Sequence, residues 1–293
     1  MVKMIYMRLS KLKSRYHLFM AFFKRQMWVR YAWIEWFLPF EILNISIGLA
    51  TWYYYALSFN GAGQFFQRYG GFVGFLIIGM ALNGLLDYSL NQPYNVVWNA
   101  YESQLSYEGV KLSMAEYLIM AKVPFNLYLI AQLSWGFIES LIRLFAYAII
   151  GTFFLGFTIS PFANYIGSFF IIMLGIIACL GIGLISASMV WLAGAWHGTE
   201  PILWFINLLV GLISGVYFPP EILPPVLRQI AYFLPQTYVL EATRLSILSG
   251  SSMELLLPYI FVLTIFCLIF LPLGTLLLKC SFKVAAKKGG LMQ

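Results

Sequence analysis

Long apolar runs separated by short polar segments make up most of this chain. A helix that crosses a bilayer needs about 20 predominantly apolar residues. Five runs of this kind cover approximately residues 36–57, 71–90, 124–150, 164–191 and 255–279. A sixth begins at residue 201. The pattern predicts an all-α integral membrane protein with six transmembrane helices.

The run that begins at 201 leads into a stretch that one spanning helix cannot hold. Residues 214–244 read SGVYFPPEILPPVLRQIAYFLPQTYVLEATR. Proline fixes φ and lacks an N–H, so helices begin at prolines and end before them. We predict two helices of roughly 10 to 14 residues, after Pro224 and after Pro235, each too short to cross a bilayer. These helices would form a re-entrant hairpin over 214–249, between the fifth and sixth spans. Its defining residues are Pro219, Pro220, Glu221, Pro224, Arg228, Pro235, Tyr238, Glu241 and Arg244.

Composition supports a membrane protein, and the charges orient it. Of the 293 residues, 61% are hydrophobic and only 10% are charged, whereas a soluble domain has about 25% charged residues. The net charge of +7 is concentrated at the two ends of the chain, so it indicates topology, and we expect no nucleic-acid partner. Loops rich in Lys and Arg stay in the cytoplasm. Both termini are therefore predicted to be cytoplasmic, which requires an even number of spans.

The predicted organisation has three parts. Residues 1–35 form a basic N-terminus, 36–282 the transmembrane domain, and 283–293 a basic tail. Within the first part, residues 17–30 mix aromatic and basic side chains, a pattern typical of a helix that lies in the inner membrane interface. Topological anchoring by the positive charges alone explains the pattern equally well. The residues concerned are Phe22, Lys24, Arg25, Trp28 and Arg30.

Several polar side chains fall inside the predicted spans. Asn44 lies in the first, and Asn83 and Asp87 share one helical face of the second because they are four residues apart. Glu139 and Arg143 have the same spacing in the third, which allows them to pair. Buried polar groups of this kind either line a substrate path or hold helices together, and the sequence leaves both roles open.

The fourth span, 164–191, is rich in Gly, Ala and Ser. Small side chains let helix backbones approach closely in a membrane, where the hydrophobic effect does not drive helices together. We therefore expect this helix to pack at the centre of the bundle or at a subunit contact.

Residues 93–121 form the longest polar segment between two spans, and the alternation of sides places it in the cytoplasm. A passive connector could be much shorter, so a docking role is one reading. A solvated amphipathic connector is the other. The candidate contact residues are Glu102, Tyr107, Glu108 and Lys111.

The hairpin carries a resemblance to a known family. The order Ser214-Gly215, aromatic, proline, acidic residue, then Pro235-Gln-Thr-Tyr238 and Glu241-Ala-Thr-Arg244, resembles the outer-leaflet hairpin of ABC-2 type permeases. These are the membrane subunits of one class of ATP-binding-cassette exporters. The six-span layout with cytoplasmic termini is also similar to that family.

The resemblance implies a function and partners. Two permeases, identical or different, would form the path for export of an amphipathic substrate across the plasma membrane of a prokaryote. A drug, a lipid and a lipid-linked glycan are all compatible. A separate ATPase subunit would hold ATP and Mg²⁺, and this chain would bind no cofactor. The basic N-terminal helix corresponds to the "elbow" helix of the family, and residues 101–115 to the coupling helix that docks on the ATPase.

The chemistry of ATP hydrolysis has no counterpart in the sequence itself. It needs a glycine-rich loop that ends in Lys-Ser or Lys-Thr, and the chain has no such motif. We therefore expect a transport subunit and not an enzyme. The alternative is a secondary transporter or channel driven by an ion gradient. That class predicts broken helices at matching positions in two related halves, whereas only one broken hairpin is evident here.

Overall fold

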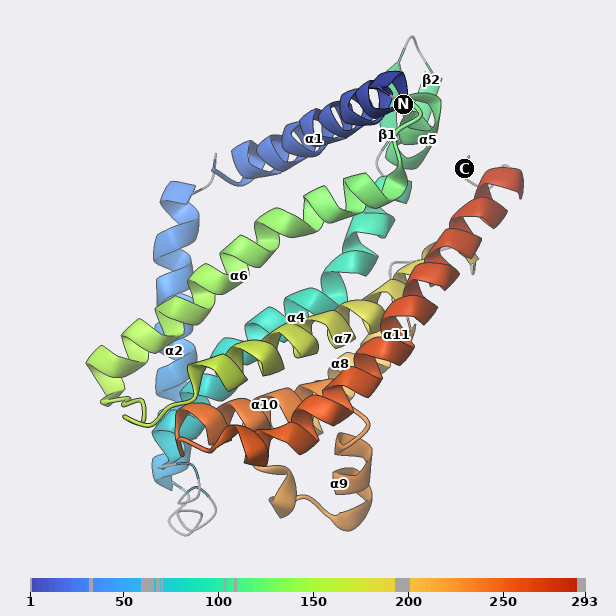
Figure 1. Ribbon diagram of the computed structural model, residues 1–293. Coiled ribbons are helices and arrows are strands. Elements are labelled where there is room, and N and C mark those ends of the chain that lie inside the picture. Colours follow the sequence, from blue (N-terminus) through green and yellow to red (C-terminus); the bar gives the residue numbers. More distant parts are fainter. Residues whose placement is uncertain are drawn as a thin grey trace.

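The computed structural model describes residues 2–31, 34–58, 66, 69, 71–102, 104–107, 110–192 and 201–288. These residues are almost entirely helical (Figure 1). The helices are α1 (Val2–Tyr31), α2 (Ile34–Ser58), α4 (Phe72–Glu102), α5 (Met114–Met120), α6 (Phe125–Leu155), α7 (Tyr165–Leu192), α8 (Pro201–Ile213), η2 (Pro220–Ile222), α9 (Pro225–Ala231), α10 (Pro235–Ile247) and α11 (Met253–Lys288). Two strands, β1 (Gln104–Tyr107) and β2 (Val110–Ser113), pair in an antiparallel hairpin.

Among the described residues, four helices are long and apolar enough to cross a membrane: α4, α6, α7 and α11. They coincide with the second, third, fourth and sixth predicted spans. The all-α architecture is confirmed, and these four helices agree with a multi-pass membrane protein. Helices α2 and α8 lie where the first and fifth spans were predicted. Helix α8 has only 13 residues, fewer than the roughly 20 that a crossing requires. The count of six spans and the cytoplasmic termini therefore stay predictions.

Helix α7 lies at the centre of the bundle, as its small residues predicted. It packs against α11, α4 and α10. A Cβ atom on Gly183 would overlap with the carbonyl oxygen of Leu90 on α4, and one on Gly181 would lie 2.6 Å from the backbone of Phe270 on α11. At these two positions, glycine is the residue that lets the helix backbones meet.

The segment after the second predicted span differs from the prediction in two ways. Helix α4 continues through Pro93 to Glu102, instead of ending near residue 90. Proline can remain within a membrane helix when neighbouring helices support the kink, and Pro93 is buried against the Gly183 position of α7. The predicted coupling helix over 101–115 is wrong, because the described part of this range holds the end of α4, then β1, β2 and the start of α5.

Alternation explains why the strands form there. Residues 104–113 read QLSYEGVKLS, in which apolar and polar residues alternate on both sides of the Glu108-Gly109 dipeptide. A period of two suits a strand and not a helix. Helix α5 then begins with a capping box, in which the Ser113 side chain accepts from the Glu116 N–H and the Glu116 carboxylate accepts from the Ser113 N–H.

Helix α1 runs alongside α6 (Figure 1). The Phe22 ring meets the Tyr128 ring edge-on at 5.4 Å, and Phe23 meets Trp135 at 5.8 Å. The helix predicted over 17–30 is thus present within a longer helix. Its position in the membrane interface stays a prediction.

Candidate functional site: the hairpin around Arg244

The chain after α8 breaks at its prolines as the sequence predicted. Helix α9 begins at Pro225 and α10 begins at Pro235, each with proline in its first turn. The predicted length of roughly 10 to 14 residues holds for α10, which has 13, but is wrong for α9, which has 7. The reason is the turn at Tyr232 and Phe233, which bond back to Arg228 and Ile230 and close the helix before Pro235.

Arg244 holds this hairpin against the rest of the bundle. Its side chain is 1% exposed. Its guanidinium donates three hydrogen bonds to backbone carbonyl oxygens: Nε to Phe75 at 3.1 Å, Nη1 to Gly215 at 2.7 Å and Nη2 to Val216 at 2.9 Å. Since Phe75 lies on α4 and the other two follow α8, one side chain of α10 joins three segments.

The surroundings of the guanidinium match its planar shape. The Phe75 ring lies beneath it, with the ring centroid 3.4 Å from Cζ. Gly79, one turn later on α4, is also adjacent, and a Cβ atom there would overlap with the guanidinium. An arginine over an aromatic face gains a cation–π interaction that strengthens away from water. This niche accepts Arg244 because residue 79 has no side chain.

Three groups near Arg244 favour its charged form: Tyr69, Glu241 and Glu221. The guanidinium group keeps its proton in proteins. Glu241, one turn earlier on α10, accepts a hydrogen bond of 2.9 Å from the Tyr259 hydroxyl on α11.

The other predicted hairpin residues have structural contacts. Pro219, Pro220 and Pro235 are buried, and Pro224 and Glu221 are exposed. Arg228 donates to the carbonyl oxygens of Glu221 and Leu223, so it closes the η2–α9 turn. The Tyr238 ring lies among those of Tyr232, Tyr259 and Phe266. The structure thus divides the predicted residues between two packing environments: α10, with Glu241 and Arg244, packs against α7, α11 and α4, whereas α9 packs against α8 and η2.

The polar residues of the second span contact a partner that the sequence analysis missed. Asn91 and Asn207 on α8 exchange side-chain hydrogen bonds of 3.2 and 2.8 Å. Asn91 also donates to Asp87 at 2.8 Å. These bonds support the helix-contact role of this face. The signal was present, because Asn207 is the one polar residue in the apolar run of α8. Asn83 is half-buried and Asn44 is exposed.

The charges of the third span also contact another helix. Arg143 forms an ion pair of 2.9 Å with Glu41 on α2. Glu139 accepts a hydrogen bond of 2.7 Å from Trp135 Nε1, one turn earlier on α6. The pairing with Glu41 joins α2 to α6, and sequence spacing could not indicate it.

The predicted ATPase contacts lie at the opposite end of the molecule from α9 (Figure 1). Glu102 is exposed at the end of α4. Tyr107 and Lys111 lie on β1 and β2, where the register pairs them with Val110 and Ser106. Glu108 lies outside the described residues. On α1, Lys24 and Arg25 are exposed, Trp28 is 70% exposed and Arg30 lies in the last turn.

Comparisons with known proteins identify no family for this chain. No family model, no curated protein and no solved structure matches the chain.

Proposed function

We propose that this chain is the permease subunit of an ATP-binding-cassette exporter of the ABC-2 type. The observation that carries the proposal is the proline-broken hairpin between α8 and α11. Its two short helices follow the prolines that carry the family resemblance. Glu241 and Arg244, the first and last residues of the string Glu-Ala-Thr-Arg, make its contacts with α11 and α4.

The two ends of the helical bundle suit two different roles. The hairpin forms one end of the bundle, and β1, β2 and α5 form the other (Figure 1). In the proposed orientation, with cytoplasmic termini, six spans and α1 in the inner interface, the hairpin lies in the outer leaflet of a prokaryotic plasma membrane. The β1–β2 hairpin with α5 then takes the docking role assigned to a coupling helix.

The mechanism follows from a two-state arrangement of packed helices. A separate ATPase subunit, holding ATP and Mg²⁺, moves the β1–β2 segment when it closes. Because Arg244 ties α10 to α4, and α4 leads directly into β1, a displacement at the docking end passes along α4 to the hairpin. A second permease completes the path for an amphipathic drug, lipid or lipid-linked glycan. ATP drives transport if it stabilises one packed arrangement over the other.

Co-purification tests the proposal. The tagged chain, expressed in its native host and extracted in mild detergent, is expected to bring down an ATPase subunit with vanadate-sensitive ATP hydrolysis. A variant with reversed charges in the docking segment serves as the matched control, because it should insert normally and lose the partner. A folded chain that brings down no ATPase would contradict the exporter assignment and favour gradient-driven transport, which ion-flux assays in vesicles would then measure.

A further inference from the structure

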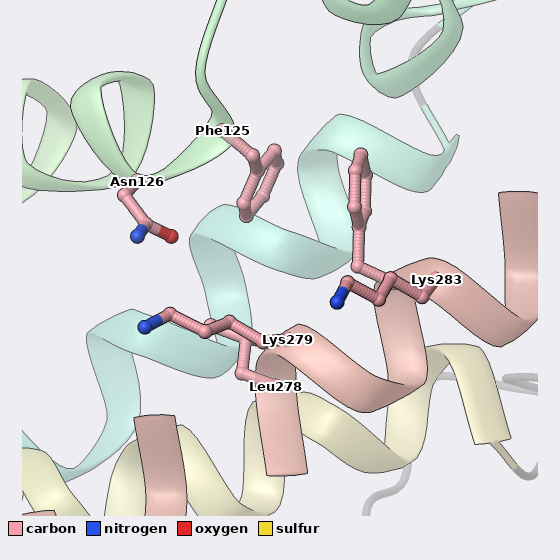
Figure 2. A pocket seen from close by; sticks show the side chains of 6 residues that line it. Phe125, Asn126, Leu278, Lys279 and Lys283 are labelled. Carbon is pink, nitrogen blue, oxygen red and sulfur yellow. The ribbon is translucent and has the colours of Figure 1, made fainter. Parts of the chain in front are cut away.

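A cavity of about 110 Å³ lies between the first turn of α6 and the last turns of α11. By the same measure, a single water molecule needs roughly 10–15 Å³, so the cavity has room for a small polar group. Figure 2 shows the side chains of Lys279 and Lys283 extending from α11 toward the same space, which Asn126 enters from α6. The lining is completed by Phe125, Leu278 and Phe282.

The back wall of the cavity is apolar and well packed. The Phe125 and Phe282 rings stack with centroids 5.3 Å apart, and Trp191 of α7 meets both rings edge-on at 5.1 and 5.0 Å. Phe125 and Leu278 are buried. Three helices therefore fix this wall, and the lysines stand at its open side.

The charges at this site lack a counter-charge. Lys279 and Lys283 are one helical turn apart, where like charges repel. Both are exposed, and the cavity lining contains no acidic residue. Within the part of the chain that the structure describes, neither lysine has a carboxylate partner. An anion in the cavity would face two ammonium groups and the amide of Asn126, and it would relieve the repulsion.

We propose that this cavity binds the phosphate-bearing headgroup of an anionic phospholipid from the inner leaflet. The phosphate lies between Lys279 and Lys283, and the upper part of an acyl chain lies on the Phe125–Phe282 wall. Basic pockets between membrane helices on the cytoplasmic side suit such headgroups. A soluble phosphate would satisfy the same lysines but would not cover the part of Phe282 that remains exposed. The inference rests on the predicted membrane orientation and is independent of the exporter assignment.

A binding titration tests the site on the full-length chain in neutral detergent. Phosphatidylglycerol labelled on its acyl chain is the probe, labelled phosphatidylcholine is the zwitterionic comparison, and fluorescence anisotropy gives the Kd. We expect phosphatidylglycerol to bind more tightly. At low salt the double variant Lys279→Gln/Lys283→Gln should weaken its binding by about 25-fold, from roughly fivefold for each lysine.

Controls separate the site from general attraction to a basic helix end. Lys287→Gln removes an exposed charge one turn farther along α11, outside the cavity, and should leave the Kd within about twofold. Lys279→Arg/Lys283→Arg should retain binding, because the charge is kept. If the double Gln variant does not fold, single Lys279→Gln provides the smaller, fivefold test.

Four results would overturn the proposal. These are wild-type affinity in the double Gln variant, an equal loss in Lys287→Gln, equal binding of phosphatidylcholine, and displacement of the labelled lipid by inorganic phosphate at the same concentration. None of them bears on co-purification with an ATPase, so the two proposals can fail separately.

Discussion

The bundle has a packed half and an open edge. The packed half comprises α4, α7 and α10, against which α11 packs with one face, and the open edge comprises α2 and the outward face of α6. Helices α7 and α6 are both apolar enough to span a membrane. In the most apolar 18-residue stretch of each helix, half of the residues of α7 are buried, compared with 11% of those of α6. Phe153 and Phe154 of α6 are 82% and 80% exposed.

Helix α7 is the more apolar of the two, but hydrophobicity alone does not explain its burial, because α11 is as apolar as α7 and only 17% of its most apolar 18-residue stretch is buried. The contacts of α7 point to side-chain size. Helix α7 brings glycines to its contacts with α4 and α11, and Ser168 of α7 bonds to Ser246 of α10 at 2.8 Å. Helix α6 presents large apolar side chains outward, which suits lipid or a second subunit. In a membrane, hydrophobicity indicates that a helix inserts, and small residues indicate which helix lies inside.

The largest effect is expected from Arg244→Ala in the packed half. The change leaves the buried carbonyl oxygens of Gly215 and Val216 without their Arg244 donors. Each lost donor should lower the free energy of unfolding by about 1–3 kcal/mol. The thermal unfolding midpoint in detergent should fall steeply, and much of the protein should fail to accumulate. Arg228→Ala, in the same hairpin but half-buried, is the matched control and should cost about 1 kcal/mol. Equal effects of the two substitutions would contradict the role of Arg244.

Gly183→Leu should cause the next largest loss. Its side chain would overlap with the Leu90 carbonyl oxygen and push α7 away from α4, at about 1–3 kcal/mol. Gly84→Ala is the control, because a Cβ on Gly84 would meet nothing within 4 Å. The measurement is again the unfolding midpoint. A Gly183→Leu protein as stable as Gly84→Ala would show that α4 and α7 do not pack this closely.

The ion pair at the open edge should matter less. Glu41→Gln removes one partner of Arg143, whose side chain is 38% exposed, so we expect a loss of about 0.5–2 kcal/mol. The exchange Glu41→Arg/Arg143→Glu restores opposite charges and should recover most of the stability. A double-mutant cycle gives the coupling energy, and a coupling near zero would mean that α2 is held to α6 by other contacts.

The smallest effect on stability is expected from the reversed pair Glu108→Lys/Lys111→Glu, outside both regions. The double reversal keeps the net charge of the segment and the opposite signs of the two residues, so the free energy of unfolding should stay within about 0.5 kcal/mol of the wild type. In the proposed exporter, however, substrate-stimulated ATP hydrolysis and transport should fall because the docking surface changes. Unchanged hydrolysis and transport would contradict the docking assignment.

Part of this architecture could be predicted from the sequence, for identifiable reasons. Prolines act locally, so the starts of α9 and α10 could be predicted from the positions of Pro224 and Pro235. The central place of α7 followed from its small residues. Helix continuation through Pro93 could not be predicted, because it depends on packing against α7. The alternation in 104–113 was a local signal for the β1–β2 hairpin. The family resemblance implied a helix over the same residues, and the helix was predicted instead.

The candidate site was predictable in its residues but not in its geometry. Arg244 and Glu241 stood out as charges in an apolar context. The partners of Arg244 could not be predicted, because a sequence does not show which backbone carbonyl groups accept its hydrogen bonds. Nor does it show that Phe75 and Gly79 lie next to the guanidinium. The same limit applies to Glu41 and Arg143, which lie on different helices, α2 and α6, and meet only in the folded bundle.

The length of α11 has a mechanical consequence. Its 36 residues extend about 54 Å at 1.5 Å per residue, whereas the hydrocarbon core of a bilayer is about 30 Å thick. Pro258 and Pro272 lie inside the helix, where proline favours a kink, and their spacing of 14 residues is within about 40° of four full turns. Both kinks therefore turn the helix the same way, and α11 bows around its neighbours (Figure 1). We expect α11 to match a thinner or thicker bilayer by changing its curvature. A change in membrane thickness would then exert a force on the hairpin that precedes α11.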